Sequence, residues 1–504
     1  VFLGVRFRLS WPGKIHPPME ETDGLPRQRM TLRAASGDVR ELESLAGAPE
    51  VDVKAPEKLE EEVADLTGDY LNVCLLLVLY TLQGIPMGLS ALFPMILKEK
   101  NVSYADLGTF SLNSYPFSLK LFWAPIVDAA YVSRIGRRKT WLIPTQLAIG
   151  LVMLVVAGSL DSLLYVEKPE IKSLTCLFFL LYFLCATQDI AVDGWALAIL
   201  RKENVGYAAT CNAIGQTLGY AIGFTGFMVL EHFGLITLAE FITLWGFIFI
   251  VVTLLVGLLK SEGAIPPDDE PESISKAYQD MFKILALHPV RLLFLLLITW
   301  KFPFAIADGV GPLKLQEFGV HKEHMAYIAS GMMPVVILLP AVVSRWTSNT
   351  TPWNLAMKAY PWRVLLVLVS TVLVSCTPSE ALHRGEIPWL FYSAVVLVYF
   401  LATVASQCMF VSQMAFFARI SDPALGGTYM TLLNTLANLG GMWPGTAVLN
   451  LIDASSCTAE TCLVKRDGFY LMSGISFIYG VLWYLLASSH ARRVQTIKLS
   501  DWRV

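Results

Sequence analysis

Long apolar segments separated by short polar ones restrict this chain to a narrow class of folds. An α-helix needs roughly 20 mostly apolar residues to cross a bilayer. Twelve segments are candidates, the ninth being short: residues 71–97, 107–128, 140–160, 173–200, 205–230, 238–259, 290–311, 324–344, 364–377, 388–417, 428–452 and 468–488. Apolar residues make up 55% of the 504, and charged residues only 16%. Since a chain in lipid must satisfy its backbone hydrogen bonds internally, the pattern predicts an all-α polytopic membrane protein.

The basic residues predict how the helices are oriented. Loops after even-numbered spans carry more Lys and Arg than loops after odd-numbered spans, and the C-terminal tail is also basic. Cytoplasmic loops carry this excess in membrane proteins. We therefore expect both termini to lie in the cytoplasm.

The longest polar segment between spans, residues 260–289, divides the helices six and six and contains an acidic, proline-rich run. It predicts two six-helix bundles, residues 71–259 and 290–489, joined by a cytoplasmic linker and followed by a tail, residues 490–504. Residues 1–70 are polar and mixed in charge, which is typical of a disordered arm. We expect that arm to be cytoplasmic.

Two aspartates lie inside the fourth apolar segment. Asp189 and Asp193 are four residues apart, so they share one helix face. Counted from Arg201 at ~1.5 Å per residue, Asp193 lies roughly 12 Å and Asp189 roughly 18 Å into a core of about 30 Å. Ionisable groups at this depth usually mark a transport pathway or a buried pair. Two hypotheses stay open: the acids titrate during transport, or a lysine neutralises them permanently.

Two lysines also lie well inside predicted spans, Lys120 in the second and Lys301 in the seventh. Buried charges are normally paired. Lys120 is then a partner for Asp189 or Asp193, and Lys301 a partner for Asp308. The alternative is that these lysines contact an anionic cargo directly.

The fifth and eleventh segments contain an internal repeat. Each has a tyrosine, an asparagine five residues on, an amide four further and a glycine three further: Tyr207, Asn212, Gln216 and Gly219, then Tyr429, Asn434, Asn438 and Gly441. The fourth and tenth segments also correspond, but Cys408 and Ser412 stand where the first copy has its two aspartates. Such repeats are typical of secondary transporters. The acids are therefore an asymmetric addition to a repeated frame.

Amide side chains within the spans are further candidates for a substrate cavity: Gln83, Gln188, Asn212, Gln216, Asn434 and Asn438. An amide in lipid would lack partners, so these side chains must face protein or water. Helix–helix hydrogen bonding and cavity lining are both consistent with the pattern. The glycines and proline after Gln83 predict a break or kink in the first helix, and Asp308-Gly309 predicts another in the seventh.

An acid at the end of the second span is followed by a basic loop: Asp128, Arg134, Arg137 and Arg138. This arrangement resembles the loop signature of the major facilitator superfamily. There, a charge cluster latches the cytoplasmic ends of the two bundles. The alternative is that these charges only hold the loop in the cytoplasm.

Longer motifs resemble the acetyl-coenzyme A transporter family over about residues 71–489. They are residues 101–104, 116–120, 123–125, 186–195, 421–423 and 426–434. The resemblance implies a major facilitator fold and a carrier in the endoplasmic-reticulum membrane. By alternating access, this carrier would move acetyl-CoA from the cytosol to the lumen, where acetyltransferases use it. A carrier of another bulky organic anion or peptide-like solute, with or without proton coupling, is the alternative.

Two features belong to the side opposite the cytoplasm in this topology. Asn101-Val102-Ser103 is a sequon that predicts glycosylation of Asn101. Cys457 and Cys462 lie in the last loop, where a disulfide can form. The pairing is not determined by sequence alone.

A membrane acetyltransferase is the main rival from another functional class. Such an enzyme would need a histidine or another base within the membrane. All seven histidines fall in predicted loops, at helix ends or in the arm. We therefore expect no enzymatic activity, no metal, no cofactor and no nucleic-acid partner. The expected partners are the lipid bilayer and the cargo, and a homodimer is left open.

Overall fold

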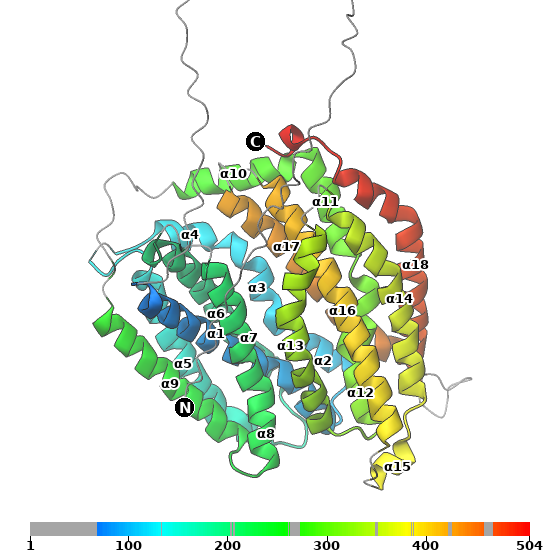
Figure 1. Cartoon of the computed structure of the whole chain (residues 1–504). Coiled ribbons are helices and arrows are strands. Elements are labelled where there is room, and N and C mark those ends of the chain that lie inside the picture. The colour runs from blue at the N-terminus through cyan, green and yellow to red at the C-terminus, as the bar shows by residue number, and fades with distance from the viewer. Residues whose placement is uncertain are drawn as a thin grey trace, which may run out of the picture. The chain divides into compact units, whose positions relative to one another are not determined.

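Helices built from the apolar segments dominate the structure, a computed structural model (Figure 1). It describes residues 68–132, 134–201, 204, 207–260, 262, 273–347, 351–384, 386, 388–421, 426–457 and 467–503. Residues 1–67 of the predicted arm lie outside the described part of the chain. The acidic run of the linker also lies outside it. The described residues belong to the unit Val63–Val504.

The first six predicted spans correspond to the helices before the linker. Four are single helices: α1 (Tyr70–Glu99), α5 (Lys139–Leu163), α6 (Ile171–Ile199) and α9 (Leu238–Leu259). The second span is a series of short helices: α2 (Tyr104–Phe110), α3 (Tyr115–Leu119) and α4 (Ala124–Ala129). The fifth contains a π-helical turn between its two parts, α7 (Tyr207–Ala221) and α8 (Phe227–His232).

The second half begins with a broken span. Its parts are α11 (His288–Thr299), a 3₁₀ turn (Phe302–Phe304), a π turn (Ile306–Val310) and α12 (Gly311–Glu317). The remaining helices are α13 (Lys322–Thr347), α14 (Trp353–Ser375), α15 (Ser379–His383), α16 (Trp389–Ile420), α17 (Gly426–Ser455) and α18 (Gly468–Val494). A break near Asp308 was predicted, and the π turn occupies that position.

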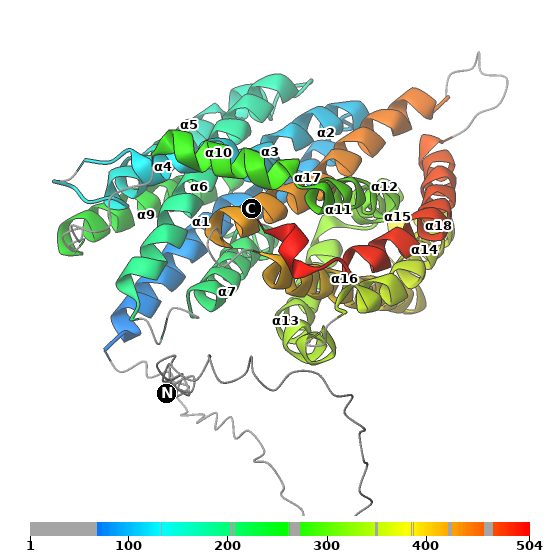
Figure 2. The same cartoon turned by 90° about the horizontal axis from the view of Figure 1, so that it is seen from above.

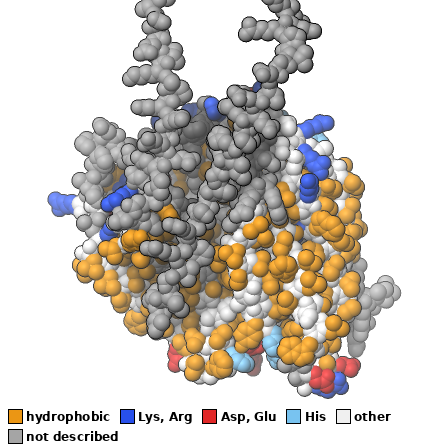
Figure 3. Space-filling model, in the orientation of Figure 1, with side chains coloured by type: hydrophobic (Ala, Val, Ile, Leu, Met, Phe, Trp, Pro, Cys, Tyr) orange, Lys and Arg blue, Asp and Glu red, His pale blue; other side chains and the backbone are white. Residues whose placement is uncertain are grey.

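In the described part of the chain, nine helices are long and apolar enough to cross a membrane. The broken seventh span, the short helices α2 to α4 and helix α17 occupy the other three predicted segments. On one face of the molecule, Lys and Arg lie mostly at the upper end and Asp and Glu at the lower end, with an apolar belt between them (Figure 3). An apolar belt of this kind is what lipid requires.

Part of the predicted linker is helical rather than a loop. Helix α10 (Ile274–Ala286) buries Met281 and Ile284 and leaves Lys283 exposed. It meets α11 at 80° and lies across one end of the helices, beside α4 and α17 (Figures 1 and 2). The Tyr278 hydroxyl donates to the main-chain oxygen of Phe122. An amphipathic pattern within a polar segment is the reason why α10 forms there.

The ninth span is longer than predicted. Helix α14 begins at Trp353, eleven residues before the predicted start at residue 364, and it includes Pro361 and Arg363. The prediction treated Arg363 as part of a cytoplasmic loop, because a charge normally ends an apolar segment. In the fold, Asp308 neutralises this arginine, so the span continues through it.

Glycines bring α1 and α7 into close contact. A Cβ atom at Gly219 would lie 2.0 Å from the oxygen of Thr81, and one at Gly84 would lie 2.3 Å from the oxygen of Gln216. Small residues allow membrane helices to approach in this way. Of the break or kink predicted after Gln83, the structure rules out the break, because α1 continues through Pro86. Its glycine serves the helix contact instead.

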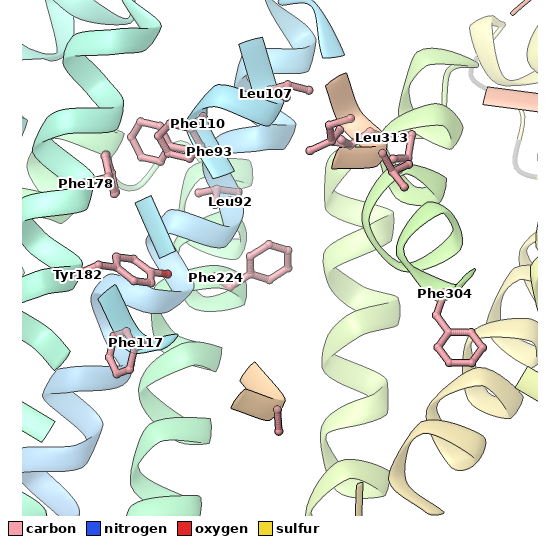
Figure 4. Packing of buried hydrophobic residues seen from close by; sticks show 14 of the residues in the cluster. Leu92, Phe93, Leu107, Phe110, Phe117, Phe178, Tyr182, Phe224, Phe304 and Leu313 are labelled. Atoms are coloured by element: carbon pink, nitrogen blue, oxygen red, sulfur yellow. The ribbon is translucent and has the colours of Figure 1, made fainter. Parts of the chain in front are cut away.

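An aromatic cluster fixes α1 and α2 against α6 (Figure 4). The ring centroid of Phe93 lies 4.4 Å from that of Phe178 and 5.8 Å from that of Phe110. All three side chains are buried. Contacts of this size stabilise a core beyond their buried area. They hold α6, which carries the two aspartates, beside α1.

The end of the molecule where α1 begins is called the Asp69 end. There Asp69 accepts hydrogen bonds from the Asn204 side chain at 2.8 Å and from the Arg201 main-chain N–H at 3.1 Å. The bond from Asn204 lowers the pKa of the Asp69 carboxyl from its usual value. Helix α1 is thereby tied to the end of α6.

The opposite end, where α1 finishes, is called the Glu99 end. Here side chains of the first six spans bind those of the last six. Lys322 lies 3.1 Å from Glu99 and 3.3 Å from Glu231, and Lys98 lies 3.1 Å from Glu317. The two halves are therefore joined by ion pairs at this end.

Candidate functional site

Asp189 is the centre of a buried polar cluster. Its Oδ1 accepts hydrogen bonds from Gln83 Nε2 at 2.6 Å and Gln216 Nε2 at 3.1 Å. Its Oδ2 forms an ion pair with the Lys120 ammonium. The side chain of Asp189 is 5% exposed. Three helical segments other than its own thus converge on one carboxylate.

Asp193 lies one helical turn away and has different partners. Its Oδ1 accepts from the Tyr80 hydroxyl at 2.7 Å and from Asn212 Nδ2 at 3.1 Å. No Lys or Arg forms an ion pair with it in the part of the chain that the structure describes. Asp193 is half-buried, whereas Asp189 is buried. The two acids therefore have unequal environments, with the cation on Asp189.

Lys120 reaches Asp189 because the second span is not a continuous helix. It begins the 3₁₀ turn Lys120–Phe122, which separates α3 from α4. The Trp123 indole N–H donates to Thr187 Oγ1 at 3.0 Å and holds this turn against α6. Prolines at the starts of α3 and α4 are compatible with such breaks. Of the two partners that the sequence allowed for Lys120, the structure has Asp189.

Gln188 is also buried beside this cluster but does not bind either acid. Its Nε2 donates to the main-chain oxygen of Leu79 at 3.3 Å. Among the described residues, the side-chain oxygens of Gln188 and Gln83 have no hydrogen-bond partner. A buried oxygen without a partner is costly unless another molecule supplies a donor. These two amide oxygens are therefore acceptors that the described part of the site leaves unsatisfied.

A cavity of about 360 Å³, here called the first cavity, opens beside Asp193. Its charged lining residues are Lys120, Asp128, Arg137, Arg138 and Asp193. Helix α10 and helix α17 also contribute to its wall, through residues such as Ala277 and Thr431. The cavity thus connects the buried acids with the basic loop at the Asp69 end.

The basic loop is held by Asp128 and by the start of the linker. Arg138 forms an ion pair with Asp128, and Arg137 Nε donates to the Asp128 main-chain oxygen at 2.8 Å. The Arg138 main-chain N–H donates to Glu262 at 2.9 Å. Arg134 is exposed. These contacts bring together Asp128, Arg137 and Arg138, three of the four residues of the predicted charge cluster.

Gly194 explains how Arg138 enters the first cavity. A Cβ atom at this position would lie 2.2 Å from the guanidinium carbon of Arg138. A larger residue would require the Arg138 side chain to move. The guanidinium of Arg138 therefore lies against α6 at Gly194, the residue that follows Asp193.

The pairing of Lys301 with Asp308 was wrong. Asp308 binds Arg363 instead, with Nη2 at 2.8 Å from one carboxylate oxygen and 2.6 Å from the other. Lys301 donates to the main-chain oxygen of Ala437 at 3.2 Å. Arg363 on α14 faces Asp308 directly in the fold and therefore forms the ion pair. The spacing of residues along the sequence does not reveal this tertiary contact.

The repeat places its amides differently in the two halves. Asn212 and Gln216 serve the aspartates of α6, but Asn434 and Asn438 on α17 bind no carboxylate in the described structure. Asn434 is half-buried and Asn438 is exposed. The second copy has Cys408 and Ser412 in place of the acids, so its amides have no such role.

Two predicted features lie in loops at the Glu99 end. Asn101 is exposed and adopts a positive φ of 57° just before α2. Cys457 is disulfide-bonded, and the six other cysteines that the structure describes are free. Cys462 lies outside the described residues.

Two important residues escaped the sequence analysis. Tyr80 was not singled out, because a tyrosine in an apolar helix is common, although it lies on the same helix as Gln83, one turn away. Arg363 was assigned to a loop. The prediction begins the ninth span at residue 364, and only the contact with Asp308 explains why Arg363 lies inside the helix.

Comparison with known proteins identifies the family. The family model described as acetyl-coenzyme A transporter 1 matches residues 72–267, 264–360 and 351–462. An uncharacterised protein of Schizosaccharomyces pombe is 34% identical, the match covering 86% of this chain and 89% of that protein. An uncharacterised membrane protein of Saccharomyces cerevisiae is 31% identical, over 85% and 96%. The anhydromuropeptide permease of Escherichia coli K12 is 28% identical over 31% of this chain and 32% of its own length.

A solved crystal structure of a single-site mutant of the nucleoside transporter NupG has the same fold. Its TM-score is 0.62 at 14% identity, and the match covers 83% of this chain and 99% of that one. This likeness confirms the predicted major facilitator fold, and the family model confirms the resemblance seen in the motifs. The chain is therefore a membrane transporter of the major facilitator type that belongs to the acetyl-coenzyme A transporter family.

Proposed function

We propose that the protein carries acetyl-CoA across a membrane by alternating access. The observation that carries this proposal is the family match, which spans the helices of both halves. A non-enzymatic role agrees with a polar cluster in which Lys120, Gln83 and Gln216 all bind Asp189. Cationic side chains around the first cavity supply a favourable field for an anion.

The contacts at the Glu99 end support the alternating-access part. Ion pairs join the halves there, and main-chain groups add to them: Ala105 N–H donates to Asp453 at 2.7 Å, and Gln316 donates to the oxygen of Met95 at 2.9 Å. The first cavity lies towards the other end. In this arrangement the cargo enters from the Asp69 end, and transport requires the Glu99 end to separate.

We infer that the Asp69 end faces the cytosol and the Glu99 end faces the lumen of the endoplasmic reticulum. Basic residues support the first assignment. The sequon at Asn101 and the disulfide at Cys457 support the second, because both modifications belong to a lumenal environment. Asp128, Arg137 and Arg138 then form a cytoplasmic gate, with Arg134 at its exposed edge.

A counterflow experiment tests the cargo. Purified full-length protein is reconstituted into liposomes loaded with unlabelled acetyl-CoA, and uptake of radiolabelled acetyl-CoA is measured. We expect accumulation above that of protein-free liposomes. If acetyl-CoA gives no counterflow while a peptide-like solute does, the cargo is wrong. The likeness to a muropeptide permease makes an anhydromuropeptide the second solute to try.

Proton coupling is measured in the same liposomes. Because Asp189 has a lysine partner, we expect uptake rates to be equal with and without a pH gradient. A rate that rises with an inward proton gradient would instead show that an acid titrates during transport.

Glycosidase treatment tests the topology. The wild-type protein made in cells is expected to lose mass on treatment, whereas Asn101→Gln is expected to run at the lower mass from the start. An unchanged mass in both would place Asn101 on the cytosolic side or leave it unmodified, and the orientation would then lose this support.

A further inference from the structure

Lys301 is a cation inside the second half that has no acidic partner among the described residues. It lies where α11 ends and the turn Phe302–Phe304 begins. Its ammonium donates to the Ala437 main-chain oxygen, and no described Asp or Glu forms an ion pair with it. A charge within a membrane span normally has a counter-charge. The missing anion is therefore the feature that needs an explanation.

The acid nearest to Lys301 in the sequence, Asp308, is paired with another residue. Asp308 binds Arg363 through both oxygens, and Arg363 Nη1 also donates to the oxygen of Ala402 at 3.0 Å. The Arg363 guanidinium carbon lies 5.3 Å from the centre of the Phe304 ring. The ion pair of Arg363 and Asp308 is neutral as a unit. The charge of Lys301 consequently remains uncompensated by the described residues.

Lys301 lines a cavity large enough for a charged group. This cavity, here called the Lys301 cavity, has a volume of about 390 Å³ and lies between the turns that follow α11 and helices α14, α16 and α17. A second cavity of about 300 Å³ shares Phe304, Asp308 and Arg363 with it. Gly441 also lines the Lys301 cavity, and the position of its missing Cβ lies 3.6 Å from the Lys301 ammonium. The ammonium therefore has open space beside it.

Two buried polar atoms at these cavities also lack partners among the described residues. Gln413 is 2% exposed and lines the Lys301 cavity, and its Oε1 has no hydrogen-bond partner in the described structure. The Tyr399 hydroxyl lines the neighbouring cavity and is likewise unsatisfied within the described ranges. A buried polar group without a partner is destabilising unless a ligand supplies the missing hydrogen bond. The described part of this region thus offers a cation, an acceptor and a hydroxyl to a ligand.

We propose that the Lys301 cavity is the subsite for a phosphate group of the cargo, with the Lys301 ammonium as its counter-charge. An ammonium has three donors, and the described structure uses one of them here, so two remain for phosphate oxygens. Gln413 Oε1 then accepts from an N–H of the same ligand. The proposal rests on the proposed function for the identity of the cargo, but the charge argument requires only an organic phosphate.

Binding measurements with three ligands test this subsite. Full-length protein in detergent is titrated with acetyl-CoA, with adenosine 3′,5′-bisphosphate and with acetyl-pantetheine, which lacks phosphate. For Lys301→Gln we expect Kd to rise about 10-fold or more for the two phosphates and to stay unchanged for acetyl-pantetheine. Lys301→Arg keeps the charge and is expected to retain most of the affinity. Lys358→Gln, an exposed lysine on α14, is the matched control and should match the wild type.

The outcomes separate this inference from the proposed cargo. If wild type transports acetyl-CoA but Lys301→Gln changes all three affinities equally, or none, the subsite is wrong and the cargo stands. If the bisphosphate binds in a Lys301-dependent way but acetyl-CoA does not, the cargo is wrong and the subsite stands. If no phosphate ligand binds the wild type, both are wrong.

A measurement on the wild type covers the case in which Lys301→Gln does not fold. The protein is treated with a small amine-acylating reagent, and modification of Lys301 is quantified by mass spectrometry. Adenosine 3′,5′-bisphosphate is expected to protect Lys301 and acetyl-pantetheine is not. Equal modification with and without the bisphosphate would overturn the proposal.

Discussion

At the scale of single residues, the cluster around Asp189 shows how this protein keeps acids inside a membrane. Lys120, Gln83 and Gln216 surround one carboxylate, whereas the described partners of Asp193 are neutral donors, Tyr80 and Asn212. A buried charge is tolerated when it is paired and hydrogen-bonded. Because of this ion pair, we expect Asp189 to act as a structural residue. We expect Asp193, which lines the first cavity, to be the acid that the cargo can reach.

Removal of Lys120 should destabilise the protein through the acid it leaves behind. For Lys120→Met we expect a loss of about 3–5 kcal/mol, because Asp189 would remain buried without its cation. The double variant Lys120→Met/Asp189→Asn removes both charges and should recover most of that loss. Thermal unfolding of purified protein in detergent measures both. Lys172→Met, at an exposed position on α6, is the control. Equal losses in the single and double variants would contradict the pairing.

Asp193 should matter for transport more than for stability. Asp193→Asn keeps the size of the side chain and can still accept from Tyr80, so we expect the melting temperature to change little. We expect the uptake rate to fall, since the charge beside the first cavity is lost. Counterflow measured beside a thermal melt distinguishes the two effects. An unchanged rate would make Asp193 part of the scaffold.

At the scale of elements, broken and closely packed helices position the site. The turn at Lys120 brings its ammonium to α6, and the glycines between α1 and α7 bring Gln83 and Gln216 to the same carboxylate. In the second half, Gly440 makes the corresponding close contact, since a Cβ there would lie 2.1 Å from the oxygen of Leu297. The repeat had aligned Gly219 with Gly441, one residue away.

The contact between α1 and α7 should not accept a side chain at Gly219. For Gly219→Ala we expect a destabilisation of about 1–3 kcal/mol or more, because the new methyl group would overlap the Thr81 oxygen. Gly158 on α5 has no neighbouring atom within 4 Å among the described residues, so Gly158→Ala is the matched control and should be neutral or stabilising. Thermal unfolding in detergent gives both values. Equal stability of the two variants would show that the helices can separate without loss.

At the scale of the whole molecule, the two halves are joined at the Glu99 end by ion pairs and hydrogen bonds. Thr225 from the first half and Ser330 on α13 have hydroxyl oxygens only 2.7 Å apart. Transport by alternating access requires such contacts to break and reform. Under the proposed alternating access, the contacts that stabilise this state must be weak enough to open.

A disulfide across this end should stop transport reversibly. The variant Thr225→Cys/Ser330→Cys is expected to cross-link on oxidation, lose most of its counterflow, and recover it on reduction. Each single cysteine variant, oxidised in the same way, is the control and should remain active. Full activity in the cross-linked protein would mean that the Glu99 end does not open during transport.

The sequence alone was sufficient for the class of fold and for much of the first-half site. Apolar length predicts the spans because lipid excludes unpaired backbone groups. A mid-membrane acid similarly demands partners, so Asp189, Lys120 and Gln216 could be singled out before any contact was known. Helix α10 was not predicted, because its many polar residues make a short amphipathic helix look like part of a polar linker.

The sequence could not decide which basic side chain forms an ion pair with which acidic one. Lys301 and Asp308 are seven residues apart on one broken span, and that spacing suggested a pair. The fold instead brings Arg363 from α14 to Asp308 and leaves Lys301 beside a cavity. The sequence determined that charges lie in the membrane, because their cost is a property of each residue and its depth. Their partners were decided only by the tertiary structure, because pairing depends on how separate helices approach in space.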